Sequence, residues 1–174
     1  DAAHTIGAVQ TRNLGTLGGN LVTCVPSMDS GPTLMALEAE VTVTGPTGKR
    51  TIPLGDFFVG PRKTILEKDA LLLEIIVPAA NLGKPASFIK FGLRKGQALA
   101  LVNAASALWI EDGKFKDVRI SLGAVAPVVI RAPKAEAILE GQSVTELLVD
   151  EAAKTAVSEA KPIDDFRASK EYRN

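Results

Sequence analysis

A short polar run near the start of the chain holds the residue types best suited to binding chemistry. Residues 10–20, QTRNLGTLGGN, place three glycines, two threonines and two asparagines between apolar flanks. Glycine lets another group approach the backbone amides without a Cβ in the way. Successive exposed amides form anion-binding concavities that suit phosphate, but a Gly-Gly pair is also common in ordinary turns. The spacing therefore leaves two interpretations open, a phosphate-binding loop and a plain turn.

Acid–base and nucleophilic chemistry find little support in the rest of the sequence. The single histidine, His4, lies near the first residue, where we do not expect a general base. The single cysteine, Cys24, lies in an apolar run, which predicts a buried and unreactive thiol. Lys90, Arg94 and Lys95 could meet a phosphate, but a solvated strand end explains them as well. The sequence favours binding over acid–base catalysis.

Composition restricts the class of protein. The chain has 174 residues, enough for one domain or two small ones. Twenty basic and twenty acidic residues cancel, so net charge favours neither nucleic acid nor an anionic membrane surface as partner. One cysteine excludes an internal disulfide and an all-cysteine metal site. No apolar run reaches about 18 residues and no signal-peptide pattern opens the chain, so we predict a cytoplasmic protein without a membrane span.

Hydrophobic periodicity and turn residues predict a mixed first part. A helix is expected to start at residues 29–32, with Asp29 or Ser30 as its cap. Residues 40–44 and 49–52 are predicted to form a hairpin around a turn at 45–48. Residues 54–58 suggest a helical turn. The almost continuous apolar run at 70–77 predicts a strand buried on both faces.

The second part is predicted to contain a three-stranded antiparallel sheet and two helices. The strands are expected at 87–93, 99–110 and 114–125, with a hairpin turn at 111–113. The alanines of 104–107 suit close packing of another element over the middle strand. Helices are expected at 134–139, closed by Gly141, and at 144–160. The predicted fold is α+β, with one domain at residues 1–80, a linker at 81–85 and a second domain at 86–174.

Several motifs resemble the FAD-binding subunit of the molybdenum hydroxylases, a family that includes xanthine dehydrogenases, aldehyde oxidases and aerobic carbon monoxide dehydrogenases. Residues 10–20 resemble the family signature Q-x-R-N-x-G-T-[IL]-G-G-N, and residues 26–32 resemble its P-x-x-D-x-x-P segment. Further matches follow in family order at 56–60, 63–64, 94–105 and 165–173. The resemblance therefore extends along the whole chain.

The resemblance implies a set of cofactor contacts. Thr16, Leu17, Gly18, Gly19 and Asn20 would hold the FAD diphosphate through backbone amides and side-chain donors. Asp29 would contact the sugar or phosphate region, and Leu72 and Lys90 match family positions that contact the flavin. From the residues alone, Lys90 gains mild support, and Leu72 is better explained as a core residue.

The family also implies partners and a missing part. Its flavin subunits assemble with an iron–sulfur subunit and a molybdenum-cofactor subunit. They pass electrons from the iron–sulfur subunit to NAD or another acceptor. Members carry an earlier Gly-Gly phosphate motif that residues 1–10 do not contain. We therefore expect an oxidoreductase subunit that lacks the N-terminal lobe, is inactive alone and binds FAD weakly.

Two other hypotheses stay open at this point. The chain could be a scaffold that docks the iron–sulfur and molybdenum subunits without binding flavin. It could also be a different FAD or nucleotide enzyme with a similar loop. The sequence does not indicate the substrate, which in the family belongs to the molybdenum subunit.

Overall fold

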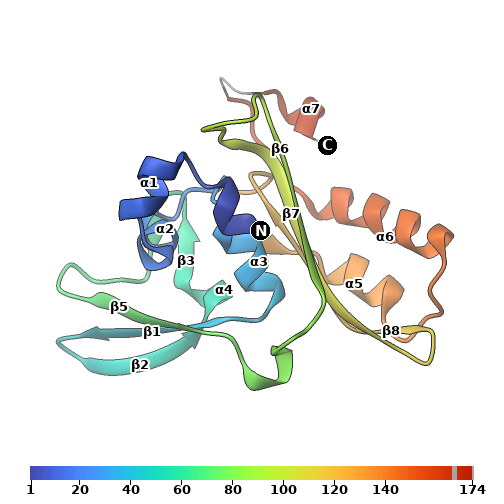
Figure 1. The fold of residues 1–174 in the computed structure, drawn as a ribbon, viewed down its shortest axis with the longest axis horizontal. Helices are drawn as coiled ribbons and strands as arrows, with labels where there is room; N and C mark the ends of the chain where they lie inside the picture. Colours follow the sequence, from blue (N-terminus) through green and yellow to red (C-terminus); the bar gives the residue numbers. More distant parts are fainter. Residues whose placement is uncertain (166–167, 174) are drawn as a thin grey trace.

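The computed structural model describes residues 1–165 and 168–173 and contains two main antiparallel sheets, each with helices beside it (Figure 1). In Figure 1 the β7–β8 region runs down the middle, between α3 on one side and α5 and α6 on the other. This arrangement confirms the predicted α+β fold. None of the helices in the described ranges is long and apolar enough to cross a membrane.

The first part of the chain combines short helices with a three-stranded sheet of order β2-β1-β5. Helices η1, a 3-10 helix, and α1 to α4 span Ala2–Thr5, Val9–Leu14, Leu17–Thr23, Ser30–Ala36 and Leu54–Phe57. Strands β1, β2 and β5 span Glu40–Gly45, Gly48–Pro53 and Leu71–Ile76, and a small pair, β3 and β4, spans Phe58–Gly60 and Lys63–Thr64. The predicted hairpin at 40–52 and the helical turn after it are confirmed.

The prediction that residues 70–77 are buried on both faces is wrong. Strand β5 is an edge strand of its sheet, and its Leu71 and Leu73 side chains are 67% and 48% exposed. Leu72 and Ile75 turn the other way and pack against the first core cluster. The continuous apolar run misled the prediction because apolar residues on the solvent face of an edge strand look the same in sequence as residues in a central strand.

The second part contains a four-stranded sheet of order β6-β7-β8-β9. Its strands span Ala86–Gly92, Ala100–Glu111, Lys114–Gly123 and Ile130–Arg131. The three longer strands match the prediction, and β9 is a fourth, two-residue strand that was not predicted from the sequence. The hairpin turn between β7 and β8 has Asp112 and Gly113 at φ +50° and +73°, the left-handed values that a two-residue hairpin requires.

The helices of the second part lie beside this sheet. Helix α5 spans Pro133–Leu139 and is followed by Gly141 at φ +72°, as predicted. Helix α6 spans Glu146–Glu159, and its N-cap Thr145 accepts a hydrogen bond from Leu148 N at 3.3 Å. Short elements complete the chain, η2 at Ala79–Asn81 and α7 at Lys170–Arg173. Phe166, Arg167 and Asn174, within or next to the C-terminal family motif, lie outside the described residues.

The alanine-rich stretch of β7 allows the close packing that the sequence predicted. Ala105 and Ala107 face α3, where they form a buried cluster with Ala36. Because side chains alternate along a strand, Ala104 and Ser106 face the opposite side of the sheet. One face of β7 is thus covered tightly by α3.

A network of charges joins the end of α3 to strand β8. Glu38 Oε1 accepts from Arg119 Nε at 2.6 Å, and Arg119 also pairs with Asp117 at 2.7 Å. Lys84, whose side chain is fully buried in the connection at 81–85, pairs with Asp117 at 2.7 Å. Asn81 Nδ2 donates to Leu37 O at 3.0 Å. The connecting segment is therefore held to both parts of the chain.

This network lowers the pKa of both carboxyl groups. Burial raises the pKa of Glu38, but the hydrogen bond and charge of Arg119 outweigh it, so the pKa lies below the ordinary 4.5. The hydrogen bond from Lys84 is the main reason why the pKa of Asp117 lies below 3.8. A carboxyl group whose pKa falls on folding stabilises the protein above its unfolded pKa, and this contribution is lost as the pH falls through the folded pKa.

We predict that Glu38→Gln lowers the free energy of unfolding by about 1 kcal/mol near neutral pH, because its partly exposed ion pairs with Arg119 and Arg131 are lost. The difference from wild type should shrink as the pH falls below about 4.5, where the wild-type carboxyl also becomes protonated. Urea unfolding between pH 7 and pH 3 measures both effects. Glu67→Gln, at an exposed carboxylate, is the matched control. An equal and pH-independent loss in both variants would contradict the prediction.

Candidate functional site

The glycine-rich run of residues 10–20 forms parts of two short helices separated by Gly15 and Thr16, and not the single loop that the sequence predicted. Helix α1 ends at Leu14, and α2 begins at Leu17. Thr16 is the N-cap of α2, and its Oγ1 accepts a hydrogen bond from Gly19 N at 2.9 Å. Threonine satisfies a free amide in this way at many helix starts, and this capping signal was not used in the prediction.

The glycines of α2 leave the first turn of the helix without side chains that would cover its backbone. Gly18 and Gly19 lie in the first helical turn and do not have positive φ angles. A Cβ added to Gly19 would lie 3.0 Å from Thr16 Oγ1, so a larger residue would press on the cap. The first amides of a helix have no acceptor within it and point outward along the axis. The start of α2 thus presents backbone donors that no side chain of residues 18–19 covers.

A cleft of about 490 Å³ lies at the start of α2. Thr16, Leu17, Gly19 and Asn20 contribute to its lining, as does Arg12 of α1. Arg12 Nη1 donates to Ile6 O at 2.9 Å, which fixes the guanidinium beside the cleft. Gly18 is not part of this lining, and the amides of Gly19 and Asn20 both donate to Thr16, which leaves the amide of Leu17 as the donor on the cleft. A cation and a free helix amide on one cleft are suited to an anionic group such as a diphosphate.

Leu72 lies next to this helix. A Cβ added to Gly18 would come within 3.4 Å of Leu72 Cδ2. Leu72 also packs against the core cluster of the first part. The structure therefore brings Leu72 together with the glycines of α2, although the two are far apart in the sequence, and the expectation that Leu72 packs against the core is confirmed.

Asp29 and Lys90 form a nearly buried ion pair. Lys90 Nζ lies 2.5 Å from Asp29 Oδ2, and the two side chains are 10% and 5% exposed. Lys90 also donates to Thr5 O at 2.9 Å, and Asn103 Nδ2 donates to Asp29 Oδ1 at 3.1 Å. Asp29 is at the N-cap position of α3, but its carboxylate makes no capping bond. The capping expectation fails because Lys90 and Asn103 hold that carboxylate.

Two of the predicted groups are linked through Ser30. Asn20, in α2, accepts a hydrogen bond at Oδ1 from Ser30 Oγ at 2.6 Å. Ser30 follows Asp29 directly, so the start of α2 and the Asp29–Lys90 pair meet through two adjacent residues. This contact uses the oxygen of the Asn20 amide and leaves its NH₂ group as the donor toward the cleft.

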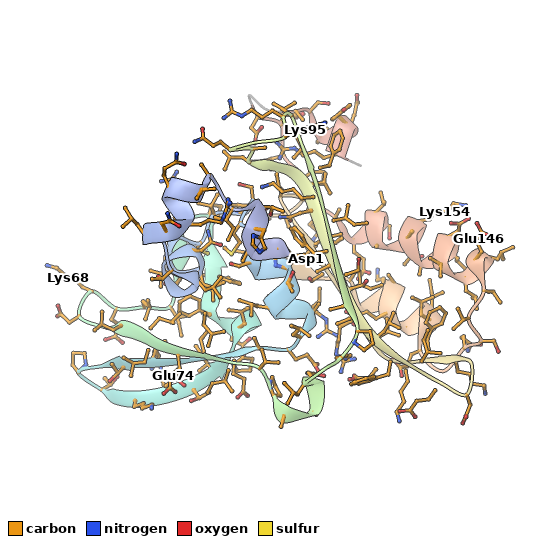
Figure 2. The ribbon with its side chains drawn as sticks, viewed as in Figure 1. Asp1, Lys68, Glu74, Lys95, Glu146 and Lys154 are labelled. Atoms are coloured by element: carbon orange, nitrogen blue, oxygen red, sulfur yellow. The ribbon has the colours of Figure 1, made fainter. Side chains whose placement is uncertain are left out.

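A second and larger cleft, of about 850 Å³, also has Arg12 in its lining. Its cationic lining residues are Arg12, Lys90, Arg94 and Lys95, and no aspartate or glutamate contributes to the lining. Figure 2 shows Lys95 at the tip of the connection between β6 and β7. Arg12 lines both clefts, and because Asp29 balances the charge of Lys90, the positive charge of the two clefts comes from Arg12, Arg94 and Lys95.

Three contributors to this region were not identified as site residues from the sequence. All three lie within matched motifs, but Arg12 and Asn103 were given no role and Ser30 was considered only as an alternative helix cap. Their motif positions were the available signal, but the contacts of Ser30 and Asn103 are long-range and invisible in local patterns.

Cys24 is buried, as the sequence predicted. Its Sγ donates to Gly60 O at 3.3 Å and to Lys63 O at 3.4 Å. Burial raises the pKa of the Cys24 thiol above its ordinary 9.0 and outweighs both hydrogen bonds. The thiol therefore serves packing, and no cluster of potential metal ligands occurs among the residues that the structure describes.

Comparison with known proteins identifies two matching family models. Residues 1–80 match the model described as FAD binding domain in molybdopterin dehydrogenase. Residues 87–174 match the model described as CO dehydrogenase flavoprotein C-terminal domain.

Individual relatives come from the same group of flavin-containing dehydrogenases. The carbon monoxide dehydrogenase medium chain of Hydrogenophaga pseudoflava is 32% identical over 99% of this chain and 60% of its own length. The putative xanthine dehydrogenase FAD-binding subunit of Escherichia coli is 28% identical over 99% of this chain and 59% of its own length. A solved carbon monoxide dehydrogenase structure from Hydrogenophaga pseudoflava superposes with a TM-score of 0.93 at 34% identity, covering 99% of this chain and 60% of the other. The chain thus spans about 60% of the length of these relatives.

We predict that Lys90→Met destabilises the fold by about 3 kcal/mol, because it leaves the Asp29 carboxylate buried without its cation. The double variant Asp29→Asn, Lys90→Met should recover a large part of that loss, since it removes both charges. Urea unfolding of the single and double variants measures the difference. If the double variant is destabilised by the sum of the two single changes, the ion pair has no such role.

Proposed function

This chain belongs to the CO dehydrogenase flavoprotein family, and on that basis we propose that it is part of the FAD-binding, electron-transferring subunit of a molybdenum hydroxylase. The observation that carries the proposal is the start of α2, where Leu17, with its free amide, and Arg12 line one cleft. We also propose that residues 1–80 and 86–174 act as two domains joined at 81–85, in agreement with the ranges of the two family models.

The start of α2 fits the diphosphate of FAD. The amides of Leu17 and Gly18 are among the free donors of the first helical turn, and the helix dipole adds partial positive charge there. Asn20 adds its side-chain NH₂, and Arg12 adds a full charge on the same cleft. A short helix contributes a weak dipole, so Arg12 supplies most of the favourable electrostatic interaction.

The remaining predicted residues would orient the cofactor. Leu72, half-buried beside Gly18, would offer an apolar surface at the edge of the diphosphate site. Lys90 is held in place by Asp29 and Thr5 O and lines the larger cationic cleft, where it would direct a donor toward the cofactor. Asp29 would act through Lys90 and Asn103, because both of its carboxylate oxygens already have partners.

When bound, FAD supplies the one- and two-electron chemistry, which no side chain of this region provides. We propose that electrons arrive from an iron–sulfur subunit, which assembles with a molybdenum-cofactor subunit, and leave to NAD or another acceptor. The names of relatives as medium chains of larger dehydrogenases support such an assembly. The chain would then have no activity alone.

The exposed edge of β5 favours the second candidate function, a docking scaffold. Leu71 and Leu73 form an apolar strip on a strand whose outer edge has no neighbour within its sheet. Such a strip suits contact with another protein surface. A scaffold without flavin would co-purify with its partners and yet show no flavin absorbance.

We predict that Gly19→Val lowers FAD affinity at least tenfold in the full-length protein that carries this chain. The new side chain would press on the Thr16 cap and enter the cleft at the start of α2. Titration with FAD, followed by flavin fluorescence quenching and thermal stabilisation, measures the effect.

Gly60→Val is the matched control, because a Cβ at Gly60 meets nothing within 4 Å and the residue lies outside both clefts. The control should bind FAD as wild type does. Wild-type affinity in Gly19→Val would mean that the start of α2 does not hold the diphosphate. Absence of FAD binding by the unaltered full-length protein would contradict the proposed function itself.

A further inference from the structure

The sheet of the second part carries a row of cross-strand neighbours on the face that α3 covers. The register places Lys90 of β6 opposite Asn103 of β7, and Asn103 opposite Gly123 of β8. Asn103 is almost completely buried, with 1% of the residue exposed. Asparagine is mostly found at the surface, and a buried amide is kept where its hydrogen bonds are used. A buried amide beside a lysine that lines a cleft therefore indicates a role for those bonds.

The NH₂ group of Asn103 holds the turn before α3. Nδ2 donates to Met28 O at 3.0 Å and to Asp29 Oδ1 at 3.1 Å. The amide cannot turn over, because its oxygen would then face two other oxygens. Asn103 Oδ1 is buried and has no hydrogen-bond partner among the residues that the structure describes. A buried acceptor in this state is unfavourable, so the two donor contacts are kept at a cost in stability.

Gly123 leaves the space that this amide occupies. A Cβ added to Gly123 would lie 2.1 Å from Asn103 Oδ1, far inside contact distance. Gly123 is not among the glycines with positive φ, so the backbone does not require glycine here. The close approach requires it, because a side chain at this position would push the amide of Asn103 away from Asp29.

The contact with Asn103 determines how Asp29 can meet Lys90. A lysine ammonium has three N–H donors. Two of those on Lys90 Nζ are used, by Thr5 O at 2.9 Å and by Asp29 Oδ2 at 2.5 Å, and the third is left for the cleft that Lys90 lines. A carboxylate without Asn103 could turn both of its oxygens to the ammonium and take this third donor. Asn103 prevents that turn because it holds Oδ1.

We propose that Asn103 is a positioning residue for bound FAD, which acts through Asp29 and keeps one N–H of Lys90 directed into the cleft. The inference rests on the proposed function, because it concerns the same cofactor. The charged groups that face Asn103 are Asp29 from the start of α3 and Lys90 from β6, and β8 contributes the uncharged Gly123. A carboxyl group in place of the amide would gain or lose its donor with pH.

The test measures the affinity of Asn103→Asp and of wild type for FAD, in the full-length protein that carries this chain, by flavin fluorescence. At about pH 8 the ionised carboxylate of the variant cannot donate to Asp29 and competes for Lys90, so the dissociation constant should be at least tenfold above wild type. Like charges raise the pKa of adjacent carboxyl groups, so towards about pH 5.5 one of the two takes up a proton and donates to the other. The ratio of the two dissociation constants should then fall towards one.

Two further variants separate positioning from folding. Asn103→Ala removes the donor without adding a charge, and should lose affinity about tenfold at every pH even if Asn103→Asp does not fold. Ser121→Ala is the matched control, because Ser121 is buried on the same sheet face and its Oγ donates to Pro32 O of α3 at 2.5 Å. This control should unfold at lower urea than wild type and bind FAD as wild type does.

Wild-type affinity in Asn103→Ala would overturn the proposal. A folded Asn103→Asp variant with the same loss at every pH would do so too, and so would an equal loss in Ser121→Ala, because any weakening of the α3 contact would then have the same effect. Absence of FAD binding by the unaltered full-length protein is a different result, which would contradict the proposed function and this inference with it.

Discussion

The buried ion pair between Asp29 and Lys90 is the contact on which the candidate site depends. It joins the start of α3 to strand β6, and Asn103 of β7 holds the same carboxylate. Ser30, the next residue, bonds to Asn20 and so fixes the start of α2 relative to the pair. A buried pair of this kind is costly to desolvate and adds little net stability. Its role here is to hold helices α2 and α3 against strand β6, and so to position the start of α2 relative to the cleft that Lys90 lines.

The two faces of the second sheet have different surroundings. One face meets α3 through Ala105 and Ala107 and presents Lys90 and Asn103 toward the proposed FAD region. The other face, with Ala104 and Ser106, lines an open apolar groove beside α6. Alternation along β7 therefore places two chemically different surfaces on opposite sides of one strand. The charge network of Glu38, Arg119 and Asp117 holds this sheet to the first part of the chain.

Local signals in the sequence were enough for most elements. Gly141, the Asp112-Gly113 turn and the alternation of β1 each had a local physical cause and were correctly interpreted. The glycine run was taken as a loop because the capping role of Thr16 was overlooked, and β5 was taken as buried because sequence does not distinguish edge from centre. The pairing of Asp29 with Lys90 joins residues 61 positions apart, and no local pattern predicts such a contact.

The central claim is that the first turn of α2 holds the diphosphate of FAD. Amide hydrogen exchange of the full-length protein, with and without FAD, tests it most directly. We expect FAD to slow exchange most at the amides of residues 17–20, with smaller effects around Leu72 and Lys90. Binding of FAD with no added protection at residues 17–20, and with protection only in other segments, would contradict the account.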